Sequence, residues 1–250
     1  MRRSRTYFLT SEPLALNEEE EPVLNPANGF VDALFEFTRP RGGLLFIASD
    51  PDQIEGTEEY ADRVFRAFAN SGYDFPDCAI LDSRNTQDTD MLLRDCGVIF
   101  LAGGHVPTEN RFFRSIDLRR RLHYSRASIV GASAGSMNCA DTVYACPEYA
   151  EEAVNPRYRR FRRGLGITTT MMIPHFAGVM NEERGGLRVL DEICLPDSVG
   201  RTFVGVPDGS FIIGHHGEEE ICGEAWILSD GEIEAINTPE LSEEEFSEEE

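Results

Sequence analysis

The sequence predicts an α/β protein built on a doubly wound, mainly parallel sheet with flanking helices and a C-terminal antiparallel extension. Three observations carry this prediction. Short apolar runs alternate with amphipathic helical patterns over the first half of the chain, one of these runs ends in a serine flanked by glycines, and short strand patterns separated by turn signals fill the second half. In such sheets, ligands bind at the carboxyl ends of the strands.

The strands expected in the first half are short apolar runs, as is typical of parallel strands that are buried on both faces. They are predicted at 6–10, 43–48, 78–81, 98–102 and 128–132. Helices are predicted between them at 32–37, 58–70, 86–95 and 109–123. The helix at 58–70 is the clearest, because Val64, Phe65 and Phe68 give it one apolar face.

The second half of the chain changes to shorter strands. They are predicted at 166–173, 202–206, 210–214, 224–228 and 232–236, and one helix is predicted at 181–192. Turn signals such as Pro207-Asp208-Gly209 separate these strands. Because no linker or repeat divides the chain, residues 1–239 are predicted to form a single domain. The acidic run 240–250 is predicted to be a disordered tail.

Composition is that of a soluble globular protein, with 250 residues of which 41% are hydrophobic. The net charge of −22 disfavours binding to nucleic acid or to an anionic membrane. Neither a membrane span nor a signal-peptide core is found, so a cytoplasmic location is expected. Six cysteines without C-x-x-C spacing disfavour a zinc site and a disulfide framework, and no metal is expected.

The most informative segment is SIVGASAGSMNC at 128–139, in which Ser133 follows an apolar run and precedes a helical pattern. A serine on a sharp strand-to-helix turn has strained backbone geometry, so the residues two positions away must be nearly free of side chain; Gly131 and Gly135 meet this demand. The segment therefore predicts a nucleophile elbow, with the Ala134 N–H available to an oxyanion. A tight turn selected for packing alone is the alternative.

A second strand end supports the same site. The run 98–102 leads into Gly103-Gly104-His105, where paired glycines allow backbone N–H groups to approach a ligand closely. The N–H of Gly104 or His105 is predicted to form an oxyanion hole together with that of Ala134. An ordinary glycine-rich loop is the alternative.

A nucleophilic serine needs a base and an acidic partner for that base. Among the five histidines, His175 has the most suitable place, because it follows the apolar run 171–173 and Pro174 at a predicted strand end. The other histidines are His105, His123, His215 and His216. The spacing does not choose among the acidic candidates, which are Asp141, Glu148, Glu151 and Glu152.

The segments GASAGSMNCADTVYACPE, LAGGHVPTEN and IPHF, in this order, resemble the peptidase E family of serine peptidases, which includes cyanophycinase. The resemblance covers most of the chain outside the tail. It implies a class I glutamine-amidotransferase-like fold with serine in place of the nucleophilic cysteine. It also implies a triad of Ser133 as nucleophile, His175 as base and Glu148, fifteen residues after the serine, as acid. Peptidase E has Asp at that position, whereas cyanophycinase has Glu.

The family favours an aspartyl residue on the acyl side of the scissile bond. The resemblance therefore implies a serine peptidase of short peptides that works through an acyl-enzyme without cofactor. Arg184 is the nearest counterpart of the arginine that binds the aspartyl carboxylate, and Gly103 and His105 are expected beside the substrate. The loop sequence Gly-Gly-His-Val replaces Gly-Gly-Asn-Thr of peptidase E, which leaves the substrate open. A catalytically silent ligand-binding fold and an esterase or amidase of small acidic metabolites remain as alternatives, and a homodimer is also left open.

Overall fold

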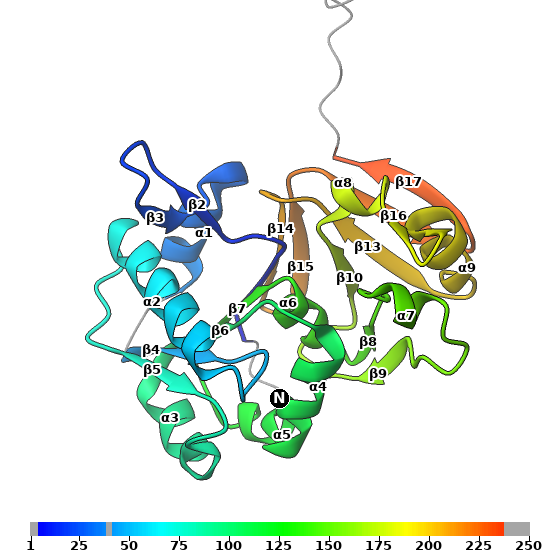
Figure 1. Ribbon diagram of the computed structural model, residues 1–250. Coiled ribbons are helices and arrows are strands. Elements are labelled where there is room, and N and C mark those ends of the chain that lie inside the picture. The colour runs from blue at the N-terminus through cyan, green and yellow to red at the C-terminus, as the bar shows by residue number, and fades with distance from the viewer. Residues whose placement is uncertain (1–4, 39–41, 238–250) are drawn as a thin grey trace, which may run out of the picture.

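The central element of the protein is a seven-stranded sheet with the strand order β15-β14-β1-β7-β6-β4-β5 (Figure 1). It is seen in a computed structural model that describes residues 5–38 and 42–237. The five strands from β1 to β5 in that order are parallel, and β14 and β15 extend the sheet in antiparallel fashion. The strands are β1 (Tyr7–Thr10), β4 (Gly43–Ile47), β5 (Cys78–Leu81), β6 (Cys96–Leu101), β7 (Ser128–Ala132), β14 (Phe211–His215) and β15 (Glu218–Cys222).

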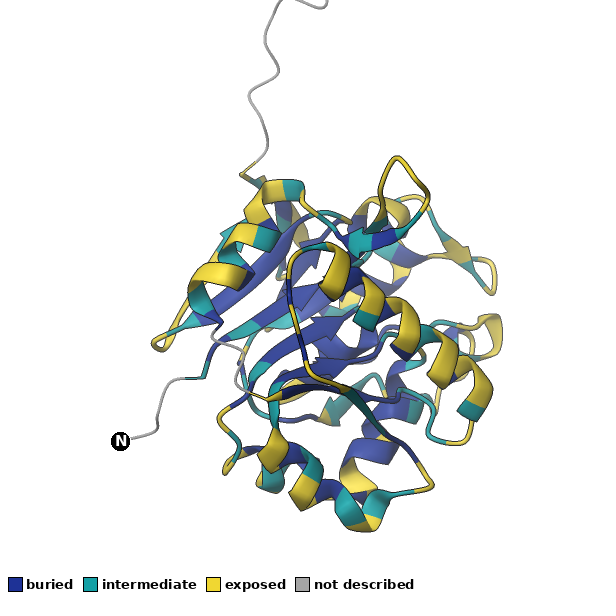
Figure 2. Cartoon of the chain, turned by 90° about the vertical axis from the view of Figure 1, so that its left-hand side faces the viewer, coloured by how far each residue is buried: buried dark blue, intermediate teal, exposed yellow. Residues whose placement is uncertain are grey.

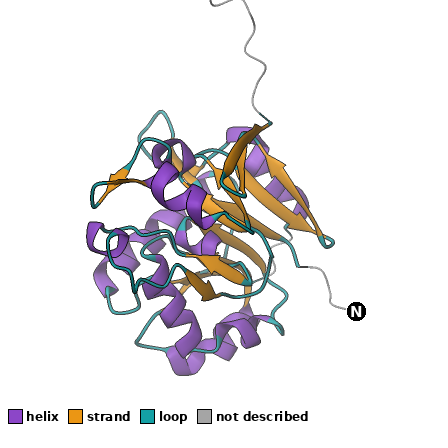
Figure 3. Ribbon diagram, turned by 90° about the vertical axis from the view of Figure 1, so that its right-hand side faces the viewer, coloured by secondary structure: helices purple, strands orange, loops and turns teal. Residues whose placement is uncertain are grey.

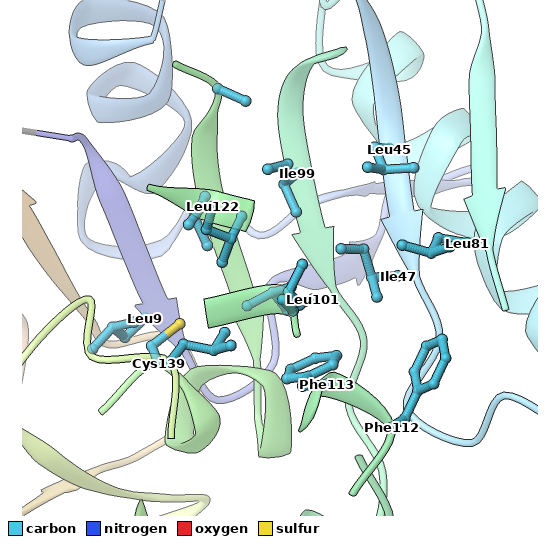
Figure 4. Close-up of a cluster of buried hydrophobic side chains, with 14 of the residues drawn as sticks. Leu9, Leu45, Ile47, Leu81, Ile99, Leu101, Phe112, Phe113, Leu122 and Cys139 are labelled. Carbon is cyan, nitrogen blue, oxygen red and sulfur yellow. The ribbon is translucent and has the colours of Figure 1, made fainter. Parts of the chain in front are cut away.

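Both faces of this sheet are buried, which explains why β4 and β6 contain only apolar residues and glycine. Along β4, Leu45 and Ile47 point into one core cluster, whereas Leu44 and Phe46 point into the other, as the period of two in a strand requires. Figure 4 shows the first cluster, where Phe112 packs against the sheet from a flanking helix. Figure 2 shows the buried strands enclosed by helices that expose their outer faces.

Helices cover the two faces in the arrangement expected of a doubly wound sheet. Apolar side chains of α1 and α2 belong to the second cluster, and those of α3, α4 and α5 belong to the first. The fold class predicted from the sequence is therefore confirmed. The helices are α1 (Phe30–Phe37), α2 (Ile54–Asn70), α3 (Thr89–Asp95), α4 (Val106–Ser115), α5 (Leu118–Leu122) and α6 (Ala134–Asn138), with 3-10 turns at Ala27–Gly29 and Thr86–Asp88.

A second sheet of four strands lies beside the first, with the order β10-β13-β16-β17 (Figure 3). β10 and β13 are parallel, and the other neighbours are antiparallel. Phe203 and Leu228 of this sheet pack in a third core cluster with Phe176. The elements are β10 (Met171–Pro174), β13 (Thr202–Val206), β16 (Ala225–Ser229), β17 (Glu232–Ile236), α8 (Phe176–Val179), a π-helical turn (Val189–Cys194) and α9 (Leu195–Asp197).

Three short two-stranded sheets and one further helix are the remaining described elements. None of these strand pairs is predicted by the sequence patterns, because each strand has only two or three residues, too few to establish a period. They are β2 (Leu14–Leu16) with β3 (Pro22–Leu24), β8 (Thr142–Tyr144) with β9 (Phe161–Arg163), and β11 (Glu183–Arg184) with β12 (Leu187–Arg188); the helix is α7 (Ala150–Ala153).

Three predicted elements differ from the structure for reasons of backbone conformation. The helix predicted at 181–192 is replaced by the β11–β12 hairpin over its first part, because Gly185 and Gly186 adopt φ values of 60° and 81°, and helical structure begins only at Val189 with the π-helical turn. The helix predicted at 109–123 is broken by Asp117, whose φ is 49°. The strand predicted at 166–173 begins only at Met171, because Gly166 has a φ of 68° and the Thr168 hydroxyl accepts the Thr170 N–H at 2.9 Å. The predicted tail at 240–250 lies outside the described residues.

Candidate active site

Ser133 lies at the turn between β7 and α6 and has the backbone geometry of a nucleophile elbow. Its φ and ψ are 47° and −110°, a conformation that costs free energy for any residue other than glycine. Hydrogen bonds on both sides hold the turn in place: the Ser133 N–H donates to the Thr10 carbonyl at 2.9 Å, and the Met137 N–H donates to the Ser133 carbonyl at 3.0 Å. Strain that is held in this way is typical of functional sites.

The glycines on either side of Ser133 leave no room for a side chain. A Cβ added to Gly131 would lie 2.7 Å from the Ser136 nitrogen, and one added to Gly135 would lie 2.3 Å from the Leu101 carbonyl oxygen. Both contacts are with backbone, which cannot move aside as a flexible side chain can. The turn therefore packs against β6 and α6 only because these positions are glycine.

We expect Gly135→Ala to lower the free energy of unfolding by about 1–3 kcal/mol, because the new methyl group overpacks a site bounded by backbone. Urea unfolding followed by circular dichroism measures the change. Gly56→Ala is the matched control: Gly56 lies in α2 with nothing within 4 Å of an added Cβ, so this variant should be as stable as the parent or more so. Equal stability of Gly135→Ala and the parent would contradict the packing argument.

The Ser133 turn opens onto a cavity of about 360 Å³ at the carboxyl ends of three neighbouring strands. Ser11 and Glu12 follow β1, Gly103 and Gly104 follow β6, and Ser133 follows β7; all of these residues line the cavity. Figure 1 shows α6, which follows β7, between the main sheet and β10 of the second sheet. The carboxyl ends of the strands form the edge at which ligands bind in doubly wound sheets.

His175 lines the same cavity from the end of β10. Its backbone is left-handed, with φ 72° and ψ 47°, and its N–H donates to the Val206 carbonyl at 3.2 Å and to the Ser11 hydroxyl at 3.3 Å. The Ser11 hydroxyl in turn donates to the Val206 carbonyl at 2.7 Å. Ser11 thereby ties the end of the main sheet to the strand end that carries His175.

The imidazole of His175 has a carboxylate partner in Asp208. The His175 Nδ1 and an Asp208 Oδ1 are 2.7 Å apart. Because an ionised carboxylate only accepts, this contact favours the tautomer with the proton on Nδ1 and leaves Nε2 as an acceptor. No hydrogen bond joins the Ser133 hydroxyl to the imidazole in the part of the chain that is described, but both groups face one cavity.

Asp208 was missed among the acidic candidates of the sequence, although a signal for it exists. It lies in the turn Pro207-Asp208-Gly209 directly after β13, and β13 is the parallel neighbour of β10. The register pairs Pro174 with Val206, so the residues that follow these two strands meet at the same sheet edge. The pairing of β10 with β13 was the missing information.

Glu148 lies elsewhere and has other partners. Its carboxylate accepts the Val106 N–H at 2.8 Å, and its own N–H donates to Glu152 at 3.0 Å. Burial raises the pKa of Glu148 above its ordinary value, which the Val106 N–H and the charge of His105 partly offset. Within the described ranges no hydrogen bond connects Glu148 to His175. The structure thus brings together Ser133 and His175 but places Asp208, rather than Glu148, on the imidazole.

Glu148 and Glu152 contact the residues that follow the glycines of the loop after β6. The His105 Nε2 contacts Glu152 at 2.9 Å and its Nδ1 contacts Thr108 at 2.8 Å, and His105 does not line the cavity as Gly103 and Gly104 do. A Cβ on Gly104 would lie 2.4 Å from the Ser49 hydroxyl. The hydrogen bonds of His105 and the bond from the Val106 N–H to Glu148 fix the position of the loop.

The N–H groups of Gly104 and Ala134 are the candidate oxyanion donors. Gly103 approaches Ser133 closely, since a Cβ added to Gly103 would lie 3.4 Å from the Ser133 Cβ. Ala134 is the first residue of α6, where a helical N–H has no intrahelical acceptor. Both donors therefore lie beside the elbow without a backbone partner among residues 5–38 and 42–237.

A buried network of polar side chains joins α4 to α6, the helix that follows Ser133. The Asn138 side chain donates to Glu109 at 3.0 Å, and the Asn110 side chain donates to the side-chain amide oxygen of Asn138 at 2.9 Å. Glu109 is fully buried, and this burial raises its pKa well above the ordinary value. The network thus links the helix that follows the glycine loop to the helix that follows Ser133.

Arg184 does not line the cavity. Its guanidinium forms a forked pair with Glu182, with the Nε at 2.9 Å, and donates to the Pro147 carbonyl. The cation in the cavity lining is Arg63 of α2, opposite in charge to Glu12. Across the described part of the chain, neither Arg63 nor Glu12 forms an ion pair, and Glu12 accepts only the Leu14 N–H at 3.1 Å.

Tyr60 is the other polar side chain of the lining that comes from α2. Burial, with a further contribution from the negative charge of Glu12, raises the pKa of Tyr60 far above its ordinary value. Its hydroxyl is therefore neutral at physiological pH. In the described residues, no group of three or more His, Cys, Asp or Glu side chains is arranged to hold a metal ion. No described helix has the length and apolar character needed to cross a bilayer.

Comparison with known proteins gives structural neighbours only. The sequence matches no protein-family model and no curated protein. Among solved structures, a peptidase from an acI-B1 Actinobacterium is similar with a TM-score of 0.62 and 15% identity, over 96% of each chain. A protein described as a "Putative Peptidase E Protein" from Listeria monocytogenes EGD-e is similar with a TM-score of 0.58 and 14% identity, over 87% of this chain and 98% of that chain. The chain therefore has a peptidase E-like fold.

Proposed function

We propose that the protein is a serine peptidase that hydrolyses short peptides with an acidic residue on the acyl side. The observation that carries this proposal is that the strained Ser133 and His175 line one cavity, with the imidazole held by Asp208 at 2.7 Å. A nucleophile, a base and a carboxylate that orients the base are the three groups needed for acyl transfer by serine. The two structural neighbours named as peptidases support the same reaction class.

In the proposed mechanism, the His175 Nε2 removes the proton from the Ser133 hydroxyl as the oxygen attacks the substrate carbonyl. The N–H groups of Gly104 and Ala134 stabilise the oxyanion of the tetrahedral intermediate. His175 then returns the proton to the leaving amine, and water hydrolyses the acyl-enzyme with His175 again as base. Asp208 holds the imidazole in the reactive tautomer and stabilises its positive charge.

The charges of the cavity favour a substrate that carries both signs. Arg63 is suited to bind a side-chain carboxylate, because a guanidinium forms paired hydrogen bonds with planar anions. Glu12 is suited to bind a free α-amino group, because its carboxylate is oriented by the Leu14 N–H and pairs with no described cation. A peptide with an unblocked N-terminal aspartate presents both groups on the residue that is acylated. In this assignment Arg63 takes the role expected of Arg184.

We expect Arg63→Gln to lower kcat/KM for aspartyl dipeptides by roughly 30- to 300-fold, because a charge-assisted pair in the cavity is lost. Peptides with a neutral first residue should change little. Hydrolysis of a matched Asp-X and Asn-X dipeptide series measures the difference. Arg66→Gln is the control, since Arg66 lies in the same helix but pairs with Glu21 and does not line the cavity. An unchanged Asp-to-Asn ratio in Arg63→Gln would remove Arg63 from substrate recognition.

A serine-directed phosphonate tests the reaction class independently of the substrate. We expect a covalent adduct at Ser133, identified by mass spectrometry of the digested protein, since an activated serine attacks phosphorus as it attacks a carbonyl. A protein that binds aspartyl peptides but neither reacts with the phosphonate nor turns the peptides over would be a ligand-binding member of the fold. Turnover of acyl esters in the absence of peptide hydrolysis would instead assign the triad to an esterase.

A further inference from the structure

Two cysteines far apart in sequence lie against each other away from the cavity. The Sγ atoms of Cys146 and Cys194 are 3.8 Å apart, although 48 positions separate the residues. Cys146 follows β8, and Cys194 ends the π-helical turn. Both are buried in the third core cluster, with 7% and 0% exposure. The described fold thus presents a pair of thiols in contact.

The surroundings of this pair are polar, which is unusual for buried cysteines. The Tyr144 hydroxyl lies 3.7 Å from the Cys194 sulfur and donates to Asp197 at 2.9 Å, and Arg160 pairs with Asp197 at 2.6 Å. Arg184 donates to the carbonyl of Pro147, the residue after Cys146. A hydroxyl, a carboxylate and two guanidinium groups thus lie around the two cysteines.

The contact between the two sulfurs favours ionisation of one of them over the other. It lowers the pKa of Cys194 below its ordinary value despite burial, and together with burial it raises the pKa of Cys146. By contrast, burial raises the pKa of Cys96 to about 12 and that of Cys139 further still. A thiolate, and not a thiol, is the species that reacts with peroxides and disulfides.

We propose that Cys146 and Cys194 form a redox pair that closes to a reversible disulfide when the protein meets a hydroperoxide. One sulfur, as thiolate, attacks an oxygen of hydrogen peroxide, breaking the O–O bond and giving a sulfenic acid and hydroxide. The second thiol attacks that sulfur, forms the S–S bond and releases the oxygen as water. Two thiols and one peroxide thus give one disulfide and two waters, and a dithiol reductant restores the thiols.

The geometry makes this closure a local change. A disulfide needs a sulfur separation of about 2.05 Å, so the two atoms must approach by less than 2 Å from their 3.8 Å contact. The closed bond would join the segment that carries Pro147 and Glu148 to the π-helical turn. Glu148 is the residue that accepts the Val106 N–H behind the glycine loop. A disulfide between cysteines 48 positions apart also stabilises the fold, because it restricts the conformations of the unfolded chain.

The test is peroxide treatment of the native full-length protein, followed by alkylation and digestion without reductant. We expect a linked peptide pair of Cys146 and Cys194 that lacks two hydrogens, reversed by dithiothreitol, and a Tm raised by several degrees in the oxidised form. The remaining cysteines are internal controls that should stay unlinked: Cys78, Cys96, Cys139 and Cys222.

Cys146→Ser and Cys194→Ser should each abolish the linked peptide and the peroxide-dependent rise in Tm. In the urea-unfolded chain the preference for this pair should disappear, because the native contact that selects it is lost. The proposal is overturned if the native protein yields no Cys146–Cys194 link, or if either cysteine is oxidised to a sulfinic acid without forming one.

Discussion

Ser133→Ala is expected to lower kcat/KM for an aspartyl dipeptide by roughly 10⁴-fold or more, because the acyl group then has no oxygen to bind to. The residual rate should be that of water attack assisted by the oxyanion donors alone. The same variant should lose all labelling by a serine-directed phosphonate. The fold should be retained, since no described hydrogen bond of the Ser133 side chain contributes to the turn and the backbone bonds to Thr10 and Met137 remain.

Ser136→Ala is the matched control, three residues along the same helix. The Ser136 hydroxyl donates to the Thr10 carbonyl at 2.8 Å and accepts the Thr10 N–H at 2.9 Å, so its loss should lower stability. It should leave phosphonate labelling in place. The two serines thus separate a chemical role from a structural one. Hydrolysis by Ser133→Ala at the parent rate would exclude Ser133 as the nucleophile, whatever the effect of Ser136→Ala.

The elbow and the parallel sheet could be predicted from the sequence because each depends on residues close together in the chain. A glycine two positions before Ser133 and another two positions after it are a local signature of the turn, and both prove to pack against backbone. The strands β4 and β6 are apolar at consecutive positions because both faces of the sheet are covered. Such patterns can be recognised in the sequence without knowing which distant residues the segment contacts in the fold.

The acid and the cation of the site could not be predicted in the same way, because both reach the cavity through long-range pairing. Asp208 meets His175 only because β13 pairs in parallel with β10, and the predicted strand at 166–173 did not reveal that register. Arg63 reaches the cavity from α2, whose polar face resembles any solvated helix face in sequence. Arg184 was expected to bind the substrate carboxylate because of its position in the sequence after His175. In the structure it lies in the β11–β12 hairpin and pairs with Glu182 instead.

The assignment of the acid can be decided by comparing Asp208→Asn with Glu148→Gln. An asparagine at 208 can present an N–H to the imidazole and so favours the tautomer in which Nε2 carries the proton and cannot act as base. We expect kcat to fall by roughly 10²- to 10³-fold. This is less than for a fully buried triad, because the side chains of His175 and Asp208 are 43% and 61% exposed and water can partly replace the carboxylate.

Glu148→Gln should lower kcat by less than about 10-fold, because the amide oxygen still accepts the Val106 N–H and the glycine loop keeps its position. Single-turnover rates of both variants, measured with the same aspartyl dipeptide, give the comparison. A small effect of Asp208→Asn together with a large effect of Glu148→Gln would return the acidic role to Glu148. It would also require the 146–152 segment to move toward His175 when substrate binds, because the Glu148 carboxylate is engaged behind the loop and the imidazole is engaged by another residue.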